Sequence, residues 1–139
     1  MTGCVFCGIA AGRAPAERLY EDRDTLAFMD INPATDGHFL VIPKRHLADI
    51  WELPPDDGVA LWRTVHRLAP VVRDGLKADG LNLVQANGPA AFQTVFHVHI
   101  HVVPRYVGDG VRLPWIPRPG DRTRIAASAE RIRAELGGR

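Results

Sequence analysis

The sequence lacks any long hydrophobic run, and this absence excludes the helical kinds of membrane protein. No apolar stretch approaches the roughly 20 residues that a membrane-spanning helix needs, although 46% of the 139 residues are hydrophobic. The opening residues, MTGCVFCGIAAG, also lack the basic start and long apolar region of a secretory signal. We therefore expect a cytosolic protein that has no membrane partner.

Charge of one sign is equally scarce. The chain has 17 Lys and Arg against 16 Asp and Glu, and its basic residues are spread along the whole sequence. Because a protein that binds duplex nucleic acid needs a clustered basic surface, we do not expect a nucleic acid duplex as a partner. A small anionic ligand remains compatible with this charge. With no internal repeat or low-complexity tract, the length suits one hydrophobic core.

Cysteine is nearly absent, and the two cysteines present form a single C-x-x-C pair, Cys4 and Cys7. In a reducing compartment this spacing indicates metal binding or redox chemistry more often than a structural disulfide. A redox pair would need a helix N-terminus in a thioredoxin-like βαβ setting, which the N-terminal residues do not provide. The choice between a metal site, a redox pair and two unliganded thiols therefore waits for other residues.

The hydrophobic pattern predicts an α+β fold with one antiparallel sheet. Period-two alternation and turn residues predict a hairpin and three further strands, at 18–22 with 25–30, and at 38–43, 80–86 and 94–103. Apolar residues at helical spacing predict a long helix over 54–76, which contains Pro70, and a second helix that follows Asp121 as its N-cap. The strands come in antiparallel pairs and the helices do not alternate with them, which argues against a parallel doubly wound sheet.

The most informative stretch is FHVHIHVVPR at 96–105, which holds three of the six histidines. In a strand, His97, His99 and His101 would share one face and the apolar residues between them the other. A single such histidine is usually a satisfied structural residue, but three in alternation indicate metal ligands or a nucleophile with helpers. A pH sensor is a weaker alternative. Three consecutive same-face positions would not converge on one ion without strain, so at least one histidine should be available for chemistry.

These residues resemble a known family. His97-Val-His-Ile-His-Val-Val matches the motif of the histidine triad family of nucleotide hydrolases and transferases, in which three histidines alternate with apolar residues. The segment 30–46 resembles the first conserved block of that family, and Asn87 precedes the triad at the expected distance. The resemblance covers about residues 3–106. We therefore expect a histidine triad domain at 1–106, and at 107–139 a proline-rich arm and a helix that pack on the same domain.

The resemblance implies a catalytic role for four residues. His99 would attack the α-phosphorus of a nucleotide, giving a nucleotidyl-histidine that water hydrolyses to release a nucleoside monophosphate. A neutral imidazole is a good nucleophile near pH 7, which agrees with this assignment. His101 would contact the phosphate and help to protonate the leaving group, His38 would support the triad through a hydrogen bond, and the Thr94 hydroxyl would donate to a phosphate oxygen.

The resemblance also implies a nucleotide site. Asp30 would bind the ribose hydroxyls, and the amides of Asn87 and Gln93 would donate to the phosphates. An apolar slot for a purine base would consist of Phe6, Ile9, Phe28 and Ile31. Without the resemblance, these four would be ordinary core residues, Asp30 a turn residue, and the two amides loop caps.

In the zinc-bearing relatives, a C-x-x-C pair binds metal together with two histidines, and the corresponding residues here are Cys4, Cys7, His46 and His97. Two thiolates and two imidazoles form a closed tetrahedral set, which is typical of structural zinc (Zn²⁺). The ion would tie the N-terminal segment to the loop after Pro43 and to the triad strand. Many family members lack the cysteines, so the ion would not take part in the chemistry.

The expected function is that of the phosphoramidase-like branch of the family, acting on a purine nucleotide conjugate. By resemblance, the chain would form a homodimer with a sheet that continues across the interface. Three alternatives stay open at this point: a dinucleoside polyphosphate hydrolase, a nucleotide-binding regulatory module with little catalysis, and a zinc hydrolase that uses the triad as ligands.

Overall fold

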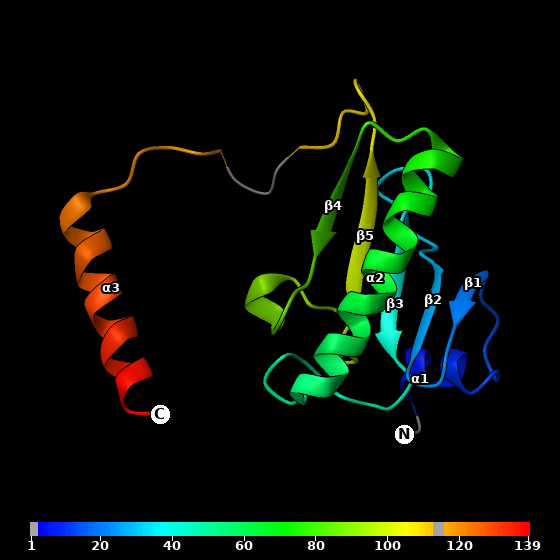
Figure 1. Cartoon of the computed structure of the whole chain (residues 1–139), viewed down its shortest axis with the longest axis horizontal. Coiled ribbons are helices and arrows are strands. Elements are labelled where there is room, and N and C mark those ends of the chain that lie inside the picture. The colour runs from blue at the N-terminus through cyan, green and yellow to red at the C-terminus, as the bar shows by residue number, and fades with distance from the viewer. Residues whose placement is uncertain (1–2, 113–115) are drawn as a thin grey trace.

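The computed structural model describes residues 3–112 and 116–139 and has one five-stranded sheet with two helices against it (Figure 1). The elements, in chain order, are α1 (Val5–Ala10), β1 (Arg18–Glu21), β2 (Thr25–Met29), β3 (Phe39–Pro43), α2 (Pro55–Leu76), β4 (Gly80–Val84), the 3-10 turn η1 (Pro89–Ala91), β5 (Ile100–Arg105) and α3 (Arg122–Gly137). Within the described ranges, no helix has both the length and the apolar character that a bilayer crossing requires.

The sheet has the strand order β1-β2-β3-β5-β4, and all of its neighbouring strands are antiparallel. This confirms the predicted α+β class, the hairpin of β1 and β2, and the pairing of β4 with β5. The hairpin turn forms because the Asp22 carboxylate accepts hydrogen bonds from the backbone N–H groups of Asp24 and Thr25, at 2.9 and 2.7 Å. His101 of β5 is paired with Leu40 of β3 on one side and with Val84 of β4 on the other.

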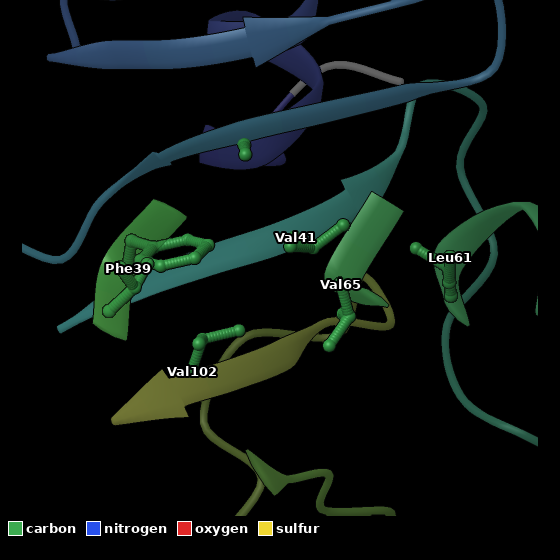
Figure 2. Close-up of a cluster of buried hydrophobic side chains, with 7 residues drawn as sticks. Phe39, Val41, Leu61, Val65 and Val102 are labelled. Atoms are coloured by element: carbon green, nitrogen blue, oxygen red, sulfur yellow. The ribbon is translucent and has the colours of Figure 1, made fainter. Parts of the chain in front are cut away.

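The two faces of the sheet support two hydrophobic clusters. On one face, Phe39 and Val41 of β3 pack against Leu61 and Val65 of α2, together with Val102 of β5 (Figure 2). On the other face, alternate residues of β2 and β3 meet α1, in a cluster formed by Phe6, Ile9, Leu26, Phe28, Leu40 and Ile42. Because each fully buried side chain of this size contributes about 1.5–3 kcal/mol, β2 and β3 form the rigid centre of the molecule.

The triad segment differs from its prediction. We predicted a strand over 94–103, but β5 begins at Ile100, so His97 and His99 precede the strand. The reason lies in the backbone of Val98, whose N–H donates to the carbonyl of Leu47 at 2.7 Å instead of to a strand of the sheet. The side chains of His97, His99 and His101 nevertheless lie in sequence along one side, on the face that α1 covers.

The C-terminal helix forms as predicted. The Asp121 carboxylate caps α3 by accepting from the Arg124 N–H at 3.0 Å. Figure 1 shows α3 well apart from the sheet and α2, and none of its side chains is buried. In the single chain α3 is therefore not seen packed on the preceding domain, and the division of the chain at residue 106 stays a prediction. Pro114 and Trp115 of that arm lie outside the described residues.

Candidate active site and metal centre

A cavity of ≈ 360 Å³ lies on the α1 side of the sheet, beside the triad. Phe6, Ile9 and Phe28 are buried and form its apolar part, as predicted for a base slot. The polar lining includes four predicted residues, namely Asp30, Thr94, His99 and His101. Ile31 also lines the cavity, but its side chain is 91% exposed, so it lies at the rim and not in the slot.

His99 is held in one tautomer by a backbone carbonyl. Its Nδ1 lies 2.7 Å from the carbonyl oxygen of His97, and because a carbonyl can only accept, Nδ1 must carry the proton. The lone pair is therefore on Nε2. The Phe6 ring packs edge-to-face against the imidazole, with 5.1 Å between the ring centroids. Burial lowers the pKa of His99, so the ring is neutral near pH 7 and can act as a nucleophile.

His38 and His101 are held by a chain of hydrogen bonds that starts at the backbone. The Ala34 N–H donates to His38 Nδ1 at 2.9 Å, so neutral His38 carries its proton on Nε2. That nitrogen lies 3.0 Å from His101 Nδ1 and 3.4 Å from a carboxylate oxygen of Asp30. His101 Nδ1 is therefore an acceptor, and the proton of His101 is on Nε2. The supporting role predicted for His38 agrees with this geometry.

The histidine neighbours control the charge of His101. Burial, followed by the nearby rings of His99 and His38, lowers the pKa of His101 to about 4, against the opposing effect of Asp30. The centroids of the His99 and His101 rings are only 4.9 Å apart. At neutral pH, the cavity therefore contains a nucleophilic nitrogen on His99 next to a neutral N–H donor on His101.

Cys4, Cys7, His46 and His97 meet at one point, as predicted. Their four ligand atoms lie within 4.8 Å of one another, and the Cys7 Sγ is 3.3 Å from His46 Nδ1 and 3.5 Å from His97 Nδ1. A tetrahedral zinc ion with bonds of about 2.0–2.3 Å requires ligand separations of roughly 3.5 Å. His97 Nε2 donates to the Pro43 carbonyl at 2.7 Å, which leaves Nδ1 to coordinate. The residues therefore fit a structural zinc ion.

A second cluster of potential ligands, Asp30, His38 and His101, also lies within 4.8 Å. Here the protonation pattern opposes a metal ion. The Ala34 N–H occupies the Nδ1 lone pair of His38, so the proton on Nε2 points to the place that a cation would take. These residues are better suited to the hydrogen-bond chain that orients His101.

Two predicted phosphate ligands are not at the cavity. The Gln93 amide donates to the carbonyls of Ala48 and Val95 and accepts from the Gly88 N–H, so it is fully used inside the loop. The Asn87 amide is similarly engaged with Gln85 and with the Ile50 N–H. Neither side chain lines the cavity. In this structure, both residues brace the loop that leads to the triad, and a direct phosphate contact stays a prediction.

Sequence reasoning missed part of the cavity lining, namely Val5, Pro15, Ala16, Met29, Asn32, Leu40 and Val95. Leu40 pairs with Phe28 in the sheet, and Phe28 was a predicted residue of the base slot, so the pairing of the two strands was a signal for Leu40. Pro15 and Ala16 belong to the loop after α1, and no periodic pattern connects that loop to the triad. Among the described residues, the lining of the cavity includes no Lys or Arg.

Comparisons with known proteins identify the family to which this chain is similar. The sequence profile of the HIT domain matches residues 11–108. An uncharacterised HIT-like protein of Mycobacterium tuberculosis is 45% identical over 88% of this chain and 77% of its own. An adenosine 5′-monophosphoramidase of Candida albicans is 32% identical over 96% of this chain and 91% of its own. An adenylylsulfatase of Arabidopsis thaliana is 41% identical over 73% of this chain and 52% of its own.

Solved structures resemble the whole chain. A crystal structure of a Streptococcus mutans protein has a TM-score of 0.92 at 41% identity, over 98% of this chain and 87% of the other. A zinc-bound histidine triad protein of Mycobacterium smegmatis has a TM-score of 0.76 at 44% identity, over 98% and 96%. This chain belongs to the HIT domain family, a family of nucleotide-binding hydrolases and transferases.

Proposed function

We propose that this protein hydrolyses a nucleoside phosphoramidate or a related nucleotide conjugate through a nucleotidyl-His99 intermediate. The observation that carries the proposal is the fixed tautomer of His99, in which Nδ1–H is bonded to the His97 carbonyl and the Nε2 lone pair remains available beside the cavity. Asp30 is at the same cavity and is proposed to bind the ribose hydroxyls. The slot of Phe6, Ile9 and Phe28 would hold the purine base.

In the first step, the His99 Nε2 lone pair forms a bond to the α-phosphorus, and the bond from phosphorus to the leaving nitrogen breaks. The leaving nitrogen departs as an amine after taking a proton from solvent at the cavity mouth, where exposed Thr94 lies. Because its pKa is about 4, His101 contributes mainly as a neutral Nε2–H donor to a phosphoryl oxygen. Water then attacks phosphorus, the bond to Nε2 breaks, and one proton returns to solvent.

The lining of the cavity supports a phosphoramidate over a dinucleoside polyphosphate. The phosphates of a polyphosphate carry several negative charges, which binding sites usually balance with Lys, Arg or a metal ion. Among the described residues that line this cavity, no Lys or Arg is present. The names of the Candida albicans and Arabidopsis thaliana relatives, a monophosphoramidase and an adenylylsulfatase, also support a single adenylyl group as the transferred unit.

Three further properties belong to the same proposal. A structural zinc ion at Cys4, Cys7, His46 and His97 is supported by the ligand distances and by the zinc-bound relative. When bound, it would act only as a cross-link between α1 and the segments around the triad.

A homodimer is supported by the outer edge of β4, which contains no charge or proline and exposes Leu83 and Val84. A cytosolic location would keep the thiols reduced.

The proposal is tested by measuring turnover of adenosine phosphoramidate beside a diadenosine polyphosphate. We expect preference for the phosphoramidate, and loss of turnover by at least about a thousandfold in His99→Ala with nucleotide binding retained. His66→Ala, on the exposed side of α2, is the matched control and should behave as wild type. Preference for the dinucleotide would indicate the polyphosphate hydrolase. Tight nucleotide binding without turnover of either would indicate a binding module.

A further inference from the structure

The helix α3 carries an apolar stripe that none of the described residues of its own chain buries. Its apolar stripe contains Ile125, Ile132 and Leu136, whose side chains are 58%, 67% and 70% exposed. An isolated helix of 16 residues is only marginally stable in water, because nucleation is costly and each residue adds little. A stable α3 therefore requires a surface that covers this stripe.

The position of α3 shows where that surface should be. Figure 1 shows α3 on the far side of β4 from the rest of the sheet. β4 is the edge of the sheet in the strand order. The helix is therefore located where a second copy would lie if it joined at the β4 edge.

The same position is present in an experimentally solved relative. The Streptococcus mutans structure reaches a TM-score of 0.92 over 98% of this chain. Since α3 is 16 of 139 residues, more than a tenth of the chain, a score this high requires α3 to superpose as well. The placement of α3 relative to the sheet is thus similar in two chains that are 41% identical.

The charges of the two parts are complementary. Residues 107–139 contain seven Arg against four acidic residues, a net charge of +3, whereas residues 1–106 contain ten Lys and Arg against twelve acidic residues, a net charge of −2. Because the two net charges are opposite in sign, contact of the arm with the body of another copy is favoured over contact with another arm.

We propose that α3 docks on a second copy of this chain through the stripe of Ile125, Ile132 and Leu136, and that the two copies exchange their arms reciprocally. A two-fold axis at the β4 edge makes each arm reach the other body, so one symmetric interface buries both stripes. The inference rests on the association of two copies proposed above and is independent of the catalytic step.

The first test compares self-association of two double variants of the full chain by analytical ultracentrifugation. Ile132→Asp with Leu136→Asp places charge in the stripe, and Ala127→Asp with Ala134→Asp places the same charge on the opposite, exposed face. We expect the stripe variant to weaken self-association by roughly a hundredfold or more, and the control to change it only a few-fold. Equal effects of the two variants, or no effect of either, would overturn the proposal.

The second test identifies what α3 touches. A photoreactive benzoylphenylalanine in place of Ile132 is irradiated in a mixture with a longer, tagged copy of the wild-type chain. We expect a covalent product with the summed mass of the two chains. A photoproduct of unchanged mass, a product with nucleic acid or lipid, or no product would each contradict docking on a second copy. Turnover of adenosine phosphoramidate in the same sample shows whether the catalytic proposal stands or fails separately.

Discussion

At the scale of single residues, three backbone groups set the chemistry of the histidines. The His97 carbonyl holds the proton of His99 on Nδ1, and the Pro43 carbonyl holds that of His97 on Nε2. The Ala34 N–H leaves the proton of His38 on Nε2, and that proton in turn makes Nδ1 of His101 an acceptor. The spacing of His97, His99 and His101 was enough to predict that they share one face, whereas the places of His38 and His46 beside them were predicted only from the resemblance to the family. The tautomers were not predictable, because they depend on carbonyl and N–H groups that only the folded backbone brings to the rings.

The low pKa of His101 makes the free energy of unfolding depend on pH. Its pKa is about 4 in the folded chain against 6.5 for an ordinary histidine, so between these values the unfolded chain binds more protons. The stability that neutral His101 contributes is therefore fully present above about pH 6.5, and it is lost as the pH falls toward about 4. We expect a loss of about 2 kcal/mol between about pH 7.5 and about pH 5, measured by urea unfolding.

The matched variants for this experiment are His101→Asn, which should flatten the decline, and His66→Asn on the exposed side of α2, which should keep it. Burial lowers the pKa of His38 and of His99 as well, so these residues act in the same direction. A protein that became more stable as the pH fell from about 6.5 to about 5 would contradict this assignment of neutral, buried imidazoles.

At the scale of elements, strong periodicity decided what could be predicted. The hairpin, β3, α2 and α3 matched their patterns because each is long or flanked by turn residues. The six-residue α1 was missed, since it is too short to show a helical period. The residues before β5 alternate like a strand, yet their backbone bonds to the loop at Leu47, a contact that no local pattern encodes.

The turn into β3 should be sensitive to one methyl group. Gly37 has φ of +89°, and a Cβ there would overlap the side chain of Leu76 at the end of α2. We expect Gly37→Ala to lower the free energy of unfolding by about 1–2 kcal/mol, mainly through the left-handed backbone, because half-exposed Leu76 can turn away. Gly75→Ala in α2, where the added Cβ meets open space, should raise it by about 0.5–1 kcal/mol. Urea unfolding of both variants measures this difference, and an unchanged Gly37→Ala would contradict it.

The segment containing α1 should depend on the metal for its position. Removing zinc with a chelator, or replacing Cys7 with Ser, deletes the cross-link to His46 and His97 and should lower the Tm by roughly 10 °C or more. At about 20 °C, the expected turnover of adenosine phosphoramidate should stay within a few-fold of that of the zinc-loaded protein, because His99 is not a ligand. Thermal unfolding and metal content are measured on the same sample. A complete loss of turnover with an intact fold, reversed by added zinc, would instead support a zinc hydrolase.

At the scale of the whole molecule, the arm and its helix were predicted, but the surface that covers α3 was not. The 107–139 segment shows a helix in its sequence, but nothing in a sequence says which copy the helix packs on.

The β4 edge gives a direct test of the dimer. Leu83→Lys places a charge at this edge and should convert a two-chain particle to a single chain in light scattering. Leu19→Lys in β1, at the opposite edge, is the control and should leave two chains. A single-chain wild type, or an unaffected Leu83→Lys, would contradict the interface.

The proposed covalent bond between His99 and the nucleotide is tested by mass spectrometry of rapidly quenched protein that is never exposed to acid. During the first turnover of adenosine phosphoramidate, the peptide that contains His99 should gain one adenylyl group through phosphorus. The same peptide of His99→Ala should gain none, while His66→Ala should behave as wild type. Turnover by wild type without any adduct, or an adduct that persists in His99→Ala, would contradict His99 as the nucleophile.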